Sequence, residues 1–237
     1  MHSRSDFNSS RLVRMLSDWA PVDARASRQN FAERLGQWVG VTDAITLHAA
    51  HQSIRLAGTA RPSAARSVRA FAVEEEFHRV QDALVGAITT SDLSAARTHA
   101  PEPQAAPEMT LDYAPYHERY LHQQRNMASM IHALRDHVRQ TISKVSPALA
   151  QLAVLDAVME QMLDERQQQL LSAVPVLLLR RFKDLREQHK HEPDATARTA
   201  QWLEVFGKEW REALLAELDV RLEPVVGMIE AFNEIKK

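Results

Sequence analysis

The fold is decided by residues 112–174, which have the sequence DYAPYHERYLHQQRNMASMIHALRDHVRQTISKVSPALAQLAVLDAVMEQMLDERQQQLLSAV. Apolar side chains recur here every three or four residues, the spacing that places them on one face of an α-helix. The pattern is interrupted only at Ser146-Pro147. Serine is a favoured N-cap residue, and proline is favoured at the first helical position, where its missing N–H costs nothing. We therefore predict two long helices joined back to back at this dipeptide.

The second of these predicted helices carries the more regular apolar stripe. Its apolar residues are separated alternately by three and four positions, as in coiled coils, and the stripe weakens at Arg166–Gln169. A hairpin alone leaves one such stripe uncovered. We predict a helix–helix interface at four of these residues: Leu152, Leu155, Met159 and Met162.

The rest of the chain is also helical in pattern. Among 237 residues there are only six glycines, and no segment shows sustained alternation of β-branched residues. We predict an all-α protein with a small N-terminal helical unit and a bundle of long antiparallel helices with coiled-coil character. The expected domains are residues 1–90, a Pro/Ala-rich linker at 91–111, and the long-helix domain at 112–237.

Shorter helices are expected on both sides of the opening stretch. Three precede Gly58, with Trp19, Phe31 and Trp38 as expected core anchors, and a fourth spans Val68 to Ile88. Beyond the hairpin, Pro175 is expected to kink or restart the helix, which continues to about His189. A final helix is expected from Trp202 to Leu222, followed by a restart at Pro224.

Composition excludes several classes of protein. The chain has no cysteine, so disulfides, thiolate zinc sites and cysteine nucleophiles are impossible. No G-x-S-x-G elbow, P-loop or dinucleotide fingerprint occurs, and we expect neither catalytic activity nor a cofactor. The longest apolar run, Val174 to Leu179, is far shorter than the roughly 20 residues that a membrane span needs. Since no signal-peptide core is evident either, we predict a cytoplasmic protein without direct membrane insertion.

The strongest local positive charge lies near the end of the opening stretch. It consists of five side chains: Arg180, Arg181, Lys183, Arg186 and Lys190. Cations at these spacings can contact successive phosphates, so DNA is a candidate ligand. A simpler interpretation is a solvated helix whose cationic end complements the helix dipole.

One motif with metal-ligand spacing occurs in the fourth expected helix. Glu75 and His78 form an E-x-x-H pair, and Glu118 with His122 is a second pair of possible ligands. A di-iron bundle needs two such motifs and two further glutamates, and only one copy is present. Because Phe77 lies on the apolar stripe, His78 is expected to face solvent. The spacing of these ligands nevertheless keeps a ferritin-like metalloprotein as an alternative hypothesis.

Several short segments of the sequence resemble those of a family of bacterial helical proteins. They are Arg28-Gln29-Asn30-Phe31-Ala32-Glu33-Arg34-Leu35-Gly36-Gln37-Trp38 with Thr42-Asp43-Ala44-Ile45, then Pro115-Tyr116 with Arg119-Tyr120, Ser146-Pro147-Ala148-Leu149-Ala150, Leu155-Asp156-Ala157-Val158-Met159-Glu160 and Leu214-Leu215-Ala216-Glu217-Leu218-Asp219. That family resembles the F component of type III Zorya anti-phage systems. None of the matched words is a catalytic motif.

The resemblance implies a non-enzymatic accessory or effector subunit. It would act with a second helical accessory protein encoded nearby and be linked in function to a membrane motor complex. A homo-oligomer and a DNA complex are further candidate assemblies. A coiled-coil scaffold unrelated to defence is the remaining alternative, because the matched words are helical in pattern and carry no activity of their own.

Overall fold

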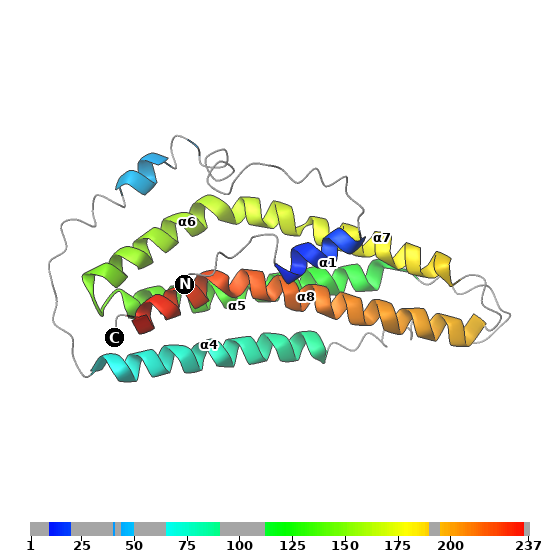
Figure 1. Cartoon of the computed structure of the whole chain (residues 1–237), viewed down its shortest axis with the longest axis horizontal. Coiled ribbons are helices and arrows are strands. Elements are labelled where there is room, and N and C mark those ends of the chain that lie inside the picture. The colour runs from blue at the N-terminus through cyan, green and yellow to red at the C-terminus, as the bar shows by residue number, and fades with distance from the viewer. Residues whose placement is uncertain are drawn as a thin grey trace. The chain divides into compact units, whose positions relative to one another are not determined.

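The computed structural model describes residues 10–19, 40, 44–49, 65–90, 112–189 and 195–234. Within these ranges every regular element is a helix, which confirms the all-α prediction. The labelled helices are α1 (Arg11–Trp19), α4 (Ala65–Thr89), α5 (Ala114–Ile142), α6 (Pro147–Leu171), α7 (Ala173–Gln188) and α8 (Ala195–Glu234) (Figure 1). The expected linker at 91–111 lies outside the described residues.

The chain divides into two compact units, each assembled from separate segments. The first unit combines Met1–Pro21, Asp82–Ala128 and Ser172–Val220. The second unit combines Val22–Gln81, Ser129–Leu171 and Arg221–Lys237. Helices α4, α5 and α8 thus contribute residues to both units, whereas α6 belongs to the second unit and α7 to the first. The predicted division into three domains stays a prediction.

At two of the boundaries between these segments, after Leu171 and after Val220, a proline four residues further on removes a helical hydrogen bond. Proline has no N–H, so Pro175 and Pro224 cannot donate the helical hydrogen bond to the carbonyl four residues earlier. Those carbonyls belong to Leu171 and Val220, each the last residue of its segment. At the first site the chain passes from α6 to α7, which confirms the predicted kink or restart. At the second site α8 continues through Pro224 without a break, so the predicted restart there is wrong.

The hairpin between α5 and α6 forms as its sequence predicts. Helix α5 ends at Ile142, and after a short turn the Ser146 Oγ accepts a hydrogen bond from the Leu149 amide at 3.2 Å. This bond satisfies an amide that lacks a helical partner in the first turn, and Pro147 fills the position at which no such bond is needed. Ser146 is therefore the N-cap of α6.

Aromatic packing forms the core of the first unit. The Phe182 ring lies 5.1 Å from the rings of Trp202 and Phe206, and Tyr116 lies 5.2 Å from Phe206, all edge to face or tilted. This geometry suits aromatic quadrupoles. Tyr113 adds a buried hydrogen bond, because its hydroxyl donates to the Pro175 carbonyl at 2.7 Å. These contacts fix α7 against α5 and α8.

Contacts in the first unit define the direction of α8 relative to α5. Within the first unit, Trp210 Nε1 donates to the Tyr116 carbonyl at 3.3 Å, and the Tyr120 hydroxyl donates to Glu217 at 2.9 Å. The paired residue numbers rise together, so α5 and α8 run parallel.

Helix α1 packs against α7 in the first unit. Its Leu12 is buried and Trp19 is half-buried. The other expected N-terminal anchors, Phe31 and Trp38, lie outside the described residues. Residues 44–49 are helical as expected, but Ile45 is 63% exposed and is not a core residue.

Apolar residues from four helices form the core of the second unit. They are contributed by α4, α5, α6 and α8: Val73, Ile131, Leu134, Val138, Ile142, Leu149, Ala153, Leu171, Leu222, Val225, Met228 and Phe232. The share of α6 is small. Of its 25 residues only Leu149, Ala153 and Leu171 are buried, so the middle of this helix is held by other forces.

Candidate interaction surfaces

Charged side chains join the middle of α6 to α5. We define the ion-pair cluster as Arg135, Arg139, Asp156 and Glu160. Arg135 binds Asp156 with both arms of its guanidinium, at 2.8 Å and 2.6 Å, and Arg139 binds Asp156 at 3.0 Å and Glu160 at 2.6 Å. The four side chains are between 10% and 20% exposed. Two-armed arginine–carboxylate contacts are specific in geometry and strong where water is excluded.

The electrostatics agree with this geometry. Burial by itself lowers the pKa of Arg139, but hydrogen bonds to Asp136 and Glu160 outweigh burial and raise that pKa above its ordinary value. In turn, the hydrogen bond from Arg139 holds the pKa of the Asp136 carboxyl below its usual range. Exposed His132 completes the edge of the cluster, with Nδ1 3.3 Å from Glu160. Every charge of the cluster therefore has an opposite charge beside it.

Because charged residues occupy the inner face of α6, its apolar residues lie elsewhere. We call Leu152, Leu155, Met159 and Met162 the α6 stripe. With about 100° of rotation per residue, the stripe lies roughly a quarter turn from the face that carries Asp156 and Glu160. Leu155 is 37% exposed and the other three are half-buried. No α6 residue from 154 to 170 is buried, so the predicted interface residues remain accessible in the described structure.

We call Arg180, Arg181, Lys183, Arg186 and Lys190 the α7 cationic patch. The fold gives these cations different surroundings. Arg181 points to α8, where it binds Glu209 with two hydrogen bonds of 2.8 Å, and these bonds raise the pKa of Arg181. Phe182 is buried, as expected for a residue that holds the helix. Arg180, Lys183 and Arg186 are exposed and make no ion pair with the described residues, and Lys190 lies outside them.

The sequence did not predict that α1 lies next to this patch. Because α1 packs against α7, its exposed Arg11 and Arg14 belong to the same unit as the free cations of α7. Exposed Asp18 and Asp184 dilute the positive charge. No periodicity joins segments so far apart in the chain, so only the fold could bring these arginines to α7.

The possible metal ligands gain no support from the geometry. Glu75 and His78 are exposed on α4, and the nearest cation to Glu75 is Arg79, at 3.9 Å. Glu118 and His122 are exposed on α5. Within the described ranges no three His, Asp or Glu side chains lie close enough together to hold a metal ion.

A buried carboxylate in the first unit was also missed by sequence reasoning. Glu217 is fully buried on α8, and it accepts hydrogen bonds from the Tyr120 hydroxyl and from the Gln124 side-chain amide at about 3 Å. Hydrogen bonds of this kind offset the cost of burying a polar group. Glu217 lies between apolar positions of a helix, and the sequence carries no signal that separates it from solvent-facing glutamates.

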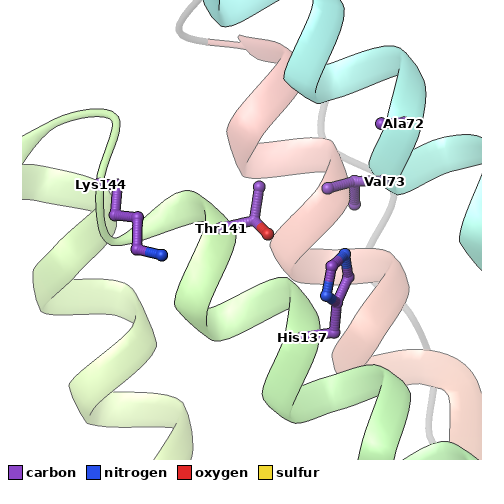
Figure 2. A pocket seen from close by; sticks show the side chains of 5 residues that line it. All are labelled: Ala72, Val73, His137, Thr141 and Lys144. Atoms are coloured by element: carbon purple, nitrogen blue, oxygen red, sulfur yellow. The ribbon is translucent and has the colours of Figure 1, made fainter.

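An open hollow of about 310 Å³ lies beside α4 and α5 in the second unit. Figure 2 shows Val73 on the α4 side of the hollow and Thr141 and His137 on the α5 side. Ala72 and Lys144 complete the lining. His137 and Lys144 are both exposed, so the hollow is open and part of its rim is polar.

Comparison with known protein families assigns the chain to one family. The chain belongs to the family described as "Protein of unknown function (DUF3348)", whose model matches residues 1–234. No curated protein and no solved structure matches the chain. In the described ranges, no helix has both the length and the apolar character that a membrane crossing requires.

Proposed function

We propose that this chain is a non-enzymatic assembly subunit of an anti-phage defence system of the Zorya type, and that it binds a helical partner through the α6 stripe. The observation that carries the proposal is the placement of that stripe. Asp156 and Glu160 attach α6 to α5, and Leu152, Leu155, Met159 and Met162 are left accessible beside them. A coiled-coil stripe that its own hairpin does not cover is suited to a second helix.

The defence role rests on the resemblance to the F component of type III Zorya systems, and a cytoplasmic location is part of the same proposal. In this function the chain acts with a companion helical protein and downstream of a membrane motor. No residue acquires a catalytic role.

The proposal is tested by phage plating of cells that carry this chain with its genomic neighbours. Replacing Leu155 and Met159 together by Glu places two charges on the stripe, and we expect phage plating to return to the level of cells without the system. Val154→Glu is the matched control, because Val154 is 45% exposed on a different face of α6. Unchanged protection by the double variant, with normal helix content, would contradict the proposed role of the stripe.

A second candidate function, contact with DNA, is favoured by the exposed cations of α1 and α7. Removing Arg180, Lys183 and Arg186 by substitution with Ala should weaken DNA binding in fluorescence anisotropy and reduce its salt dependence, because each phosphate contact releases counterions. Arg125→Ala, at an exposed position of α5, is the control. If wild-type binding is unmeasurable at low salt, or the triple variant binds equally well, the DNA function is excluded.

A further inference from the structure

We propose that α6 is a strap over α5, which opens as a unit by breaking the ion-pair cluster while the other helices of the second unit stay packed. This opening is independent of the proposed function, since it requires no partner. The inner face of α6 is the side that lies within about 40° of one line along the helix and carries Leu149, Ala153, Asp156, Glu160, Leu163 and Leu171. Both ends of the inner face are apolar and buried, whereas its centre is charged.

The other long helices of the second unit have apolar residues at the centre of their contacts. Six of these residues are at most 6% exposed: Ile131, Leu134 and Val138 in α5, and Leu222, Val225 and Phe232 in α8. Separating α5 from α8 transfers these side chains to water, at a cost that grows with their apolar area. From residue 154 to residue 170, α6 has no buried residue. Opening α6 therefore exposes less apolar surface of its own than opening α5 or α8.

The charges at the centre of the inner face make opening easier still. Arg135, Arg139, Asp156 and Glu160 are between 10% and 20% exposed, so in the closed state they have lost most of their contact with water. When α6 leaves α5, all four charges regain that contact together, and their hydration offsets the ion-pair attraction that is lost. The ion-pair cluster thus fixes the position of α6 on α5 more strongly than it opposes opening.

Both ends of α6 allow it to move as one helix. At its start, the Ser146 Oγ accepts a hydrogen bond from the Leu149 amide at 3.2 Å, so the N-cap belongs to α6 and moves with it. At its end, α6 stops at Leu171 and α7 begins at Ala173, and Pro175 cannot donate a helical hydrogen bond across this boundary. Hinges are commonly a few residues at the ends of such elements.

The first experiment is hydrogen–deuterium exchange of the full chain, followed by mass spectrometry. A detached helix of this length is only marginally stable, so its amides exchange with solvent. Relative to their intrinsic rates, we expect amides of residues 154–170 to exchange at least about tenfold faster than those of residues 222–232 in α8. Raising NaCl from about 0.05 M to about 0.5 M should accelerate exchange in α6 alone, because salt screens the ion pairs. Equal protection of the two segments, or no effect of salt on α6, overturns the proposal.

A locked variant tests the role of the charges. Arg135, Arg139, Asp156 and Glu160 are replaced together by Leu, since apolar residues in place of a buried ion-pair network usually stabilise the closed state. Exchange in residues 154–170 should slow by at least about tenfold and lose its dependence on salt. Glu165→Gln, at an exposed position of the same helix, is the control and should behave as the wild type. A folded locked variant whose α6 exchanges as fast as the wild type, and with the same salt dependence, overturns the role of the cluster.

A milder variant tests the same opening without rebuilding the contact. Asp156→Asn keeps the shape of the side chain and removes its charge, which leaves Glu160 as the α6 carboxylate of the cluster beside Arg135 and Arg139. We expect exchange in residues 154–170 to accelerate by about tenfold while residues 222–232 keep the wild-type rate. Equal acceleration in both segments would show that α6 opens only with the whole unit, and unchanged exchange in α6 would show that the cluster does not hold it. Either result overturns the proposal.

Discussion

In the first unit α7 and α8 meet through aromatic rings, and in the second unit α5 and α6 meet largely through charged side chains. Phe182 and Phe206 are buried and in direct contact in the first unit. The corresponding contact in the second unit joins Arg135 and Arg139 to carboxylates. Burial of aromatic surface gives stability without dependence on salt, whereas ion pairs respond to salt and pH.

This difference in packing bears on the proposed interface at the α6 stripe. A helix that is held by apolar packing has its apolar face already occupied. Helix α6 is held by charges on its inner face, and the four residues of its stripe stay half-buried or exposed. The same comparison predicts that the two units respond differently to substitution.

The largest effect is expected in the aromatic core. Phe206→Ala removes a fully buried ring that contacts Tyr116 and Phe182, and we expect a loss of about 3–5 kcal/mol in the free energy of unfolding, measured by denaturant titration. Val205→Ala, at the neighbouring exposed position, should cost less than about 0.5 kcal/mol. Similar losses for the two variants would show that the ring cluster does not form the core.

A smaller effect is expected from the ion-pair cluster. Asp156→Ala leaves Arg135 and Arg139 with Glu160 as the remaining acidic partner on α6, and we expect a loss of about 2 kcal/mol, reduced at high salt. Glu165→Ala, at an exposed position of the same helix, is the control. A loss below about 0.5 kcal/mol would place the cluster among ordinary surface ion pairs and remove the contrast between the units.

The smallest effect at neutral pH is expected at Tyr113. Tyr113→Phe removes the hydrogen bond to the Pro175 carbonyl, which contributes about 1 kcal/mol. Burial raises the pKa of Tyr113 above its ordinary value, so the stabilisation is complete below about pH 10 and is lost as the pH rises further. Above about pH 10, the thermal unfolding temperature of Tyr113→Phe should therefore fall less steeply with pH than that of the wild type. Parallel curves would contradict the assignment.

Much of the fold could be predicted from local sequence. Ser146 and Pro147 define the start of α6 because capping depends on residues within one turn. Pro175 defines the change from α6 to α7 for the same local reason. Pro224 shows the limit of such rules, since packing of Val225 and Phe232 in the second unit holds α8 together despite the missing hydrogen bond.

The candidate surfaces could be predicted only in part. Periodicity identified the α6 stripe, but which face of α6 contacts α5 depends on the pairing of Asp156 with Arg135, 21 positions away. The α7 cationic patch was visible as a run of charges, although its sequence did not distinguish Arg181, which binds Glu209, from exposed Arg180. Pairings between distant helices are set by tertiary contacts, which a single sequence does not record.

The sequence by itself determined the helical class, the hairpin at Ser146 and the spacing of the α6 stripe, because these follow from interactions within a few residues along the chain. The tertiary structure decided that α8 runs parallel to α5, that Glu217 is buried and that α6 is attached through charges. Those outcomes depend on which helices pack together and in which register along their axes. The accessibility of the stripe is therefore a property of the folded chain. It follows from the pairing of Asp156 and Glu160 with Arg135 and Arg139 of α5, which sets the face of α6 that contacts α5.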